Sequence, residues 1–221
     1  MSEEIIRLLL LDDHASFREL LALRLAREPD LTVVAEAGSL LEARQAVRQI
    51  EADVALVDLD LPDGSGVELI RDLREVNPEA QAVLLTASGD RHLHAAAVAA
   101  GASGILSKAV SSADIIAAIR RLATGDPLLS PREAIELFRL ADRQREAERT
   151  AHRIIEQLTP RERDLLQHLA EGLDDAGIAE RLSISPKTVR NQMVGLLAKL
   201  GVDSRLQALV LAARHGIVTI G

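Results

Sequence analysis

The chain has 221 residues, a length that fits two compact domains. Of these residues 48% are hydrophobic and 27% charged, a composition that excludes a mainly disordered protein. It contains no cysteine, which excludes disulfides, thiolate catalysis and metal centres held by cysteine. The formal net charge of −8 argues against binding polyanions by overall charge, and two phenylalanines are too few aromatic rings for a surface that stacks single-stranded bases.

The first 125 residues alternate short apolar runs with amphipathic segments. The apolar runs lie at residues 5–11, 31–35, 54–57, 82–85 and 104–106. Stretches with helical periodicity follow them at about 14–28, 39–51, 66–76, 90–100 and 112–123. Strands that are apolar on both faces and alternate with single helices form parallel sheets covered on both sides. We therefore predict an α/β domain with a doubly wound, five-stranded parallel sheet over residues 1–125.

Polar residues follow four of the five apolar runs. They are Asp12, Asp13, His14, Asp58, Asp60, Thr86, Ser88, Ser107 and Lys108. One aspartate after a strand is most often a helix cap or a solvated loop residue. In parallel sheets, however, the carboxyl ends of the strands meet at one edge and build the ligand site. The whole set therefore predicts a single functional site.

Several carboxylates at one site repel each other unless a cation lies among them, and oxygen ligands of this kind suit Mg²⁺. With that charge neutralised, the Asp58 carboxylate can attack a phosphoryl group and hold it as an acyl phosphate. Thr86 can donate a hydrogen bond to a phosphoryl oxygen, and Lys108 can supply compensating positive charge.

The chain resembles the receiver domain of two-component response regulators, a CheY-like member of the flavodoxin-like folds. The resemblance covers about residues 5–124 and rests on the Asp12-Asp13 pair and the strings VALVDLDLPDGSG, LLTAS and GASGILSK. It implies that Asp58 is the phosphoacceptor. It also implies Asp12 or Asp13 with Asp58 as Mg²⁺ ligands, the Asp60 carbonyl as a further ligand, and Thr86 and Lys108 as the switch pair.

Two residues depart from the family pattern. Ile105 stands on the last strand where an aromatic residue is common, and an aliphatic side chain cannot act as the usual swinging ring. Asp60 is an unusual acid two positions after the phosphoacceptor, and we expect its carboxylate to affect hydrolysis of the acyl phosphate.

A phosphatase is the competing enzyme interpretation. Asp58 and Asp60, with Thr86 and Lys108 downstream, partly match the haloacid-dehalogenase phosphatases. Those enzymes need a further acidic pair on a strand after the lysine, whereas here only Asp114, in a predicted helix, follows it within the domain. The order of the motifs therefore favours a regulator and not an enzyme.

Residues 126–157 are predicted to be a helical linker. Ser130-Pro131 is typical of a helix start, and a short apolar patch follows it. Residues 141–153 are rich in Arg and Glu, which is typical of a solvated helix or a hinge. A helix that dimerises is the alternative interpretation of this segment.

Residues 158–221 are predicted to form a small all-α domain. Its helices are expected at about 160–171, 174–182, 186–200 and 203–214. Thr159-Pro160 and Ser185-Pro186 are typical helix starts, and Asp174 can cap the second helix. The window 181–205 has a net charge of +4 within the acidic chain. Two helices joined by a three-residue turn, with basic residues opening the second, predict a helix-turn-helix that enters the DNA major groove.

This region closely resembles the LuxR-type helix-turn-helix domain of the NarL/FixJ family. The strings LTPRERDLLQHLAEG, IAERLSISPKTVRNQ and LLAKLGVDSRLQA carry the resemblance over about residues 158–212. It implies phosphate contacts by Lys187 and Thr188, and positions facing base edges at Arg190, Asn191 and Val194. Several residues depart from the pattern: Gly177, Gln192, Val194 and Gly195. We expect modest DNA affinity of a monomer and dimerisation on paired half-sites.

We predict a DNA-binding response regulator in which a sensor histidine kinase phosphorylates Asp58 and so controls dimerisation and transcription. Leu206, Leu209 and Val210 offer an apolar stripe for a homodimer, although burial in their own domain is the commoner fate. No membrane span or secretion signal is evident, so we expect a cytoplasmic protein without membrane partners. The alternative is an orphan regulator or protein-interaction module with a degenerate phosphate site, which Ile105 favours.

Overall fold

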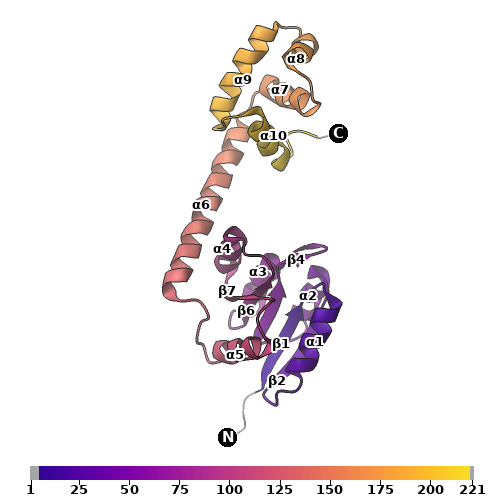
Figure 1. Cartoon of the computed structure of the whole chain (residues 1–221), viewed down its shortest axis with the longest axis vertical. Coiled ribbons are helices and arrows are strands. Elements are labelled where there is room, and N and C mark those ends of the chain that lie inside the picture. Colours follow the sequence, from indigo (N-terminus) through magenta and orange to yellow (C-terminus); the bar gives the residue numbers. More distant parts are fainter. Residues whose placement is uncertain (1–4, 220–221) are drawn as a thin grey trace. The chain divides into compact units, whose positions relative to one another are not determined.

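The computed structural model describes residues 5–219, and the chain forms two compact units (Figure 1). The first unit comprises residues 1–142 and the second residues 143–221. The division lies inside the segment 126–157 that the sequence analysis assigns to a linker. Among the described residues, no helix is both long enough and apolar enough to cross a membrane.

A five-stranded parallel sheet with the order β2-β1-β3-β6-β7 forms the centre of the first unit. Its strands are β1 (Ile6–Leu11), β2 (Leu31–Ala37), β3 (Val54–Asp58), β6 (Gln81–Thr86) and β7 (Ala102–Ser107). The helices that alternate with them are α1 (Ala15–Leu25), α2 (Leu40–Val47), α3 (Gly66–Val76), α4 (Arg91–Ala100) and α5 (Ser112–Ala123). The structure confirms the predicted doubly wound parallel sheet.

Helices cover both faces of this sheet. On one face α2, α3 and α4 pack around buried strand residues such as Leu9, Val57 and Leu84. On the other face α1 and α5 pack around Leu8 and Leu56. Neighbouring residues such as Leu8 and Leu9 serve opposite cores because side chains alternate along a strand. This two-sided burial is the physical reason for the continuous apolar runs in the sequence.

A short ribbon that the sequence analysis did not predict follows β3. Its strands, β4 (Asp60–Leu61) and β5 (Gly64–Ser65), pair antiparallel and lead into a capping box at the start of α3. A Cβ atom on Gly66, the first residue of α3, would lie 1.9 Å from the carbonyl oxygen of Asp58. Glycine is therefore required for this helix to approach the end of β3 so closely.

The helix α6 (Pro131–Glu156) runs across the division between the units. In the first unit its residues Leu137 and Ala141 are buried against Ala95 and Val98 of α4. Its later part belongs to the second unit, where Ile155 enters the core. The stretch 141–153 is helical and mostly exposed, as expected for a solvated helix.

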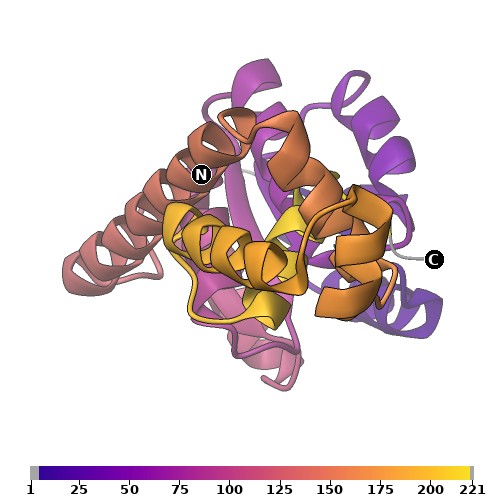
Figure 2. The same ribbon diagram turned by 90° about the horizontal axis from the view of Figure 1, so that it is seen from above.

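Four helices form the rest of the second unit, drawn in orange to yellow in Figures 1 and 2. They are α7 (Pro160–Ala170), α8 (Asp175–Leu182), α9 (Pro186–Leu200) and α10 (Arg205–Arg214). Thr159, Asp174 and Ser185 cap the first three of these helices as predicted, each accepting a hydrogen bond from a backbone amide. Ser183, at φ 53°, makes the sharp turn between α8 and α9. The result is the predicted helix-turn-helix.

Candidate functional site

The ends of four neighbouring strands bring the predicted polar residues together. Asp12 follows β1, Asp58 ends β3, Thr86 ends β6 and Lys108 follows β7. Among the described residues, Asp12, Asp58 and Thr86 are the buried side chains of polar or charged type. Since isolated buried carboxylates are costly, their presence at one edge of the sheet marks a site with a function beyond packing.

Lys108 connects the two buried carboxylates. Its Nζ atom lies 2.7 Å from Oδ2 of Asp12 and 2.7 Å from Oδ2 of Asp58. The Asp12 oxygen receives no well-directed hydrogen bond, so its contact with the ammonium is mainly electrostatic. Lys108 also lies over the ring of Phe17, with Nζ 5.3 Å from the ring centre, a distance that allows a cation–π interaction.

The charges of this site are unbalanced. Burial raises the pKa of the Asp58 carboxyl, and the Lys108 ammonium offsets this effect only in part. Burial also acts to lower the pKa of Lys108, but its two carboxylate neighbours outweigh burial and the pKa is raised. The ammonium therefore remains charged at neutral pH. Two buried carboxylates share it, which leaves an excess of negative charge for a further cation to neutralise.

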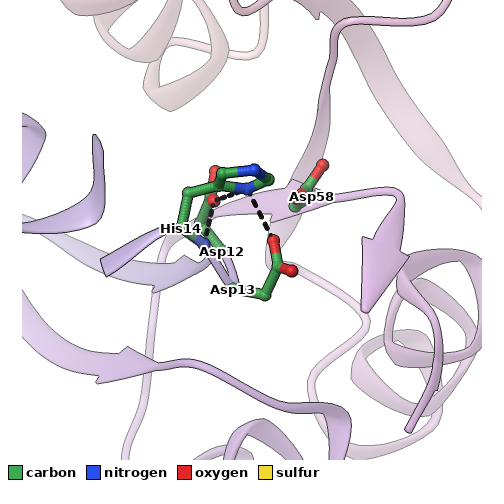
Figure 3. Close-up of side chains that lie close together, drawn as sticks. All are labelled: Asp12, Asp13, His14 and Asp58. Carbon is green, nitrogen blue, oxygen red and sulfur yellow. Dashed lines mark hydrogen bonds and ion pairs between the residues drawn. The ribbon is translucent and has the colours of Figure 1, made fainter. Parts of the chain in front are cut away.

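Four side chains offer ligand atoms that lie within 4.8 Å of one another. Figure 3 shows these side chains lying close together. They are Asp12, Asp13, His14 and Asp58. The carboxylate oxygens, including the buried Asp12 Oδ2 that lacks a directed hydrogen bond, fit a hard divalent cation such as Mg²⁺. Asp60 is not in this group: it lies in β4 with an exposed side chain. His14 is not among the metal ligands predicted from the sequence, although its place next to two aspartates was a visible signal.

Thr86 lies beside the acidic group and is tied to the loop that follows it. Its Oγ1 accepts a hydrogen bond of 2.9 Å from the Ser88 amide, and its carbonyl accepts one from the Lys108 amide. Ile105 lies opposite Leu84 on the neighbouring strand and is half-buried. It packs against the sheet core and against the cluster that joins α4 to α6.

In the second unit, α9 has one buried and one exposed face. The buried residues are Val189, Met193, Leu196 and Leu200. Of the predicted DNA-contacting residues, Lys187, Arg190, Asn191 and Val194 are exposed. Their spacing of three and four residues places them on one stripe of the helix. The fifth, Thr188, is half-buried, and its hydroxyl lies 2.8 Å from the Ser185 hydroxyl at the helix start.

An acid of α8 neutralises part of this surface, which the sequence analysis did not foresee. Asp175 lies 2.7 Å from Arg205 and 3.4 Å from Arg190, measured between nitrogen and carboxylate oxygen. The contact joins α8, α9 and α10 and depends on their packing, so no local sequence pattern reveals it.

The apolar stripe predicted on α10 is partly exposed. Leu206 is 70% exposed and Val210 is 47% exposed, while the half-buried Leu209 packs against the core of the unit. Leu206 and Val210 therefore lie outside the core of their own unit, although such a stripe is more commonly buried within its own domain.

Comparison with known proteins finds two family matches. Residues 8–120 match the response regulator receiver domain, and residues 156–212 match the luxR family of bacterial regulatory proteins. The chain is 39% identical over 207 residues to the DNA-binding transcriptional activator DevR/DosR of Mycobacterium tuberculosis, with 94% of each protein covered. It is 34% identical over 209 residues to the nitrate/nitrite response regulator protein NarL of Escherichia coli, with 95% of each covered.

Two solved structures are also similar. A two-component response regulator of the LuxR family from Aurantimonas shares 30% sequence identity at a TM-score of 0.54, covering 64% of this chain and 99% of that one. The response regulator ChrA of a heme-sensing two-component system shares 31% identity at a TM-score of 0.50, covering 96% of this chain and 98% of that one.

Proposed function

Because the chain belongs to the response regulators that join a receiver domain to a LuxR-type DNA-binding domain, we propose that phosphorylation of Asp58 controls its action on DNA. The protein is a DNA-binding transcriptional regulator of a two-component system, as its two domains and its relatives together show. We also propose a phosphoacceptor, a metal site, a set of DNA contacts and a dimer.

The phosphoryl group is transferred to Asp58 from a phosphohistidine of a sensor kinase or from a small acyl phosphate. A carboxylate oxygen of Asp58 attacks phosphorus, the bond from phosphorus to the donor atom breaks, and an acyl phosphate remains. Lys108, which already lies 2.7 Å from Asp58, balances the charge of the phosphoryl oxygens. Thr86 donates its hydroxyl hydrogen to one of them.

Mg²⁺ is the cation proposed for the acidic group. Asp12, Asp13 and Asp58 would hold it through carboxylate oxygens, and the Asp60 carbonyl is a further proposed ligand. When bound, the cation supplies positive charge that lowers the repulsion between the carboxylates and the incoming phosphoryl group. The exposed carboxylate of Asp60 is proposed to affect hydrolysis of the acyl phosphate. An unchanged lifetime of the phosphoprotein in Asp60→Asn would contradict that last proposal.

The start of α9 is the proposed DNA-reading surface. Lys187 and Thr188 contact backbone phosphates, which also suit the amino end of a helix. Arg190, Asn191 and Val194 face base edges in the major groove. The exposure of four of these residues on one stripe supports the assignment.

The active form is proposed to be a homodimer on paired half-sites in the cytoplasm. The exposed Leu206 and Val210 of α10 give a second copy an apolar surface to cover. A dimer also strengthens binding when each copy alone binds weakly. A sensor histidine kinase is the proposed partner of the receiver domain.

The observation that carries the proposal is the Lys108 ammonium between two buried carboxylates. The test treats wild type and Asp58→Ala with acetyl phosphate and Mg²⁺, and measures intact mass and sedimentation. We expect a phosphoryl adduct and a faster-sedimenting species in wild type only. DNA binding without any adduct would contradict the proposal and favour the orphan regulator, whereas repeated turnover of a phosphomonoester would favour the phosphatase.

A further inference from the structure

A chain of hydrogen bonds leads from Thr86 to α4. The Thr86 hydroxyl oxygen accepts the Ser88 amide hydrogen at 2.9 Å. The Ser88 carbonyl oxygen lies 3.0 Å from Nε2 of His94, a half-buried residue of α4. Because a carbonyl can only accept, Nε2 of His94 must carry the hydrogen of this contact. One residue, Ser88, thus contacts both the Thr86 hydroxyl and the helix.

Apart from this contact and an ion pair between Arg91 and Glu136 of α6, the helix that His94 belongs to is held by small side chains. Its buried residues are Ala95, Ala97 and Val98. Alanines bury little apolar area, so each contributes less to holding the helix than a leucine would. Ala95 and Val98 of the same helix pack against Leu137 and Ala141 of α6. A shift of α4 therefore changes the packing of the first turns of α6 against α4.

On the neighbouring strand β7, Ile105 offers no second path of hydrogen bonds from the phosphorylation site to α4, because its side chain is aliphatic. It packs against both apolar clusters but has no polar atom with which to respond to a new charge at Asp58. The geometry points to His94 as the positioning residue that couples the Thr86 hydroxyl to α4 and α6, an inference that rests on the proposed phosphorylation of Asp58.

The coupling requires only one exchange of hydrogen bonds. When rotation about the Thr86 Cα–Cβ bond carries Oγ1 toward a phosphoryl oxygen, Oγ1 moves away from the Ser88 amide and the hydrogen bond from that amide breaks. Ser88 then keeps two contacts with α4: its carbonyl with His94, and its hydroxyl oxygen, which accepts a hydrogen bond from the amide of the capping residue Asp90. A change in the Ser88 backbone therefore moves α4, and the His94 contact carries that movement past the first residue of the helix. Without the imidazole, Ser88 stays joined only to the cap of α4 at Asp90, and the movement no longer reaches the part of α4 that packs against α6.

The test uses full-length variants, acetyl phosphate and Mg²⁺, with two measurements on each sample. Intact mass reports phosphorylation. Hydrogen–deuterium exchange of peptides within residues 131–141 reports how well the first turns of α6 pack against α4. In wild type we expect phosphorylation to change the exchange of these peptides. In His94→Ala we expect the same phosphoryl adduct, but the exchange of these peptides should stay at the rate measured before phosphorylation.

Two substitutions separate the hydrogen bond from simple packing. His94→Gln places an amide N–H after the same number of bonds as Nε2 and should restore the exchange response, whereas the shorter His94→Asn should not. His92→Ala is the matched control, because His92 lies on the same helix with an exposed side chain. It should respond like wild type.

Each outcome decides one question. A wild-type exchange response in His94→Ala overturns the coupling but leaves the phosphoacceptor intact. The same holds if wild type becomes phosphorylated with no change in residues 131–141. If wild type acquires no phosphoryl group, the proposed function falls and the coupling falls with it.

Discussion

The acidic pocket of the first unit and the exposed stripe of α9 in the second are built in opposite ways. The pocket gathers Asp12, Asp58, Thr86 and Lys108 from the ends of four strands and buries them. The stripe takes its residues from a single helix and leaves them in solvent. Substitutions in the pocket should therefore change stability as well as chemistry, whereas substitutions on the stripe should change binding alone.

The largest effect is expected from Lys108→Ala. Removing one partner from buried charges leaves the carboxylates uncompensated, which typically costs about 3–5 kcal/mol. We expect the free energy of unfolding to fall by about 3 kcal/mol on this basis, measured by urea denaturation at neutral pH without Mg²⁺. Lys187→Ala, the matched exposed lysine of α9, should change it by less than about 0.5 kcal/mol. Equal effects of the two substitutions would break the comparison.

Arg190→Ala tests the exposed region. If Arg190 contacts a base edge, its loss should weaken binding to a specific DNA site by about 1–3 kcal/mol, which is about fivefold to 150-fold. Its unfolding should match wild type, since its side chain is exposed. Fluorescence anisotropy at several salt concentrations provides the measurement, and wild-type affinity should fall steeply as salt rises. Unchanged affinity in the variant would show that Arg190 is not part of the DNA-reading surface.

Gly195→Ala tests whether the backbone of α9, like its exposed side chains, is free of constraints from packing. Gly195 lies inside α9, and a Cβ atom there would meet nothing within 4 Å. Alanine should therefore stabilise the helix by about 1 kcal/mol through helix propensity alone. The exposed Ala198, on the same helix, gives the reverse control as Ala198→Gly. Thermal unfolding measures both, and a destabilised Gly195→Ala would show a constraint at this position beyond propensity.

The smallest effect concerns Glu162, which joins α7 to α9 through Lys199 at 2.7 Å. Partial burial acts to raise the pKa of Glu162, but hydrogen bonds from Lys199 and Thr159 outweigh it and the pKa is lowered. The ionised form thus stabilises the fold above the ordinary value of 4.5, and this contribution is lost as the pH falls through the lowered pKa.

Glu162→Gln should consequently be less stable than wild type at neutral pH by about 0.2–1 kcal/mol, the range of partly exposed pairs. The difference should shrink as the pH falls below 4.5. Urea denaturation across this range measures it. A difference that is constant with pH would show that the carboxylate charge contributes nothing.

The contrast between the two regions also explains what the sequence could predict. The sheet and its helices were predictable because two-sided burial imposes long apolar runs, and the pocket was predictable because parallel strands end at one edge. The ribbon formed by β4 and β5 was missed because two-residue strands have no periodicity. The pairing of Asp175 with Arg205 and the contact of His94 with Ser88 depend on tertiary packing, which no local pattern records.

The most direct test of the account is to locate the phosphoryl group. After treatment with acetyl phosphate and Mg²⁺, borohydride reduces an acyl phosphate to a primary alcohol, which peptide mass spectrometry assigns to one residue. We expect the alcohol at Asp58 alone. Reduction at Asp12, Asp13 or Asp60 instead, or at no residue despite the treatment, would contradict it.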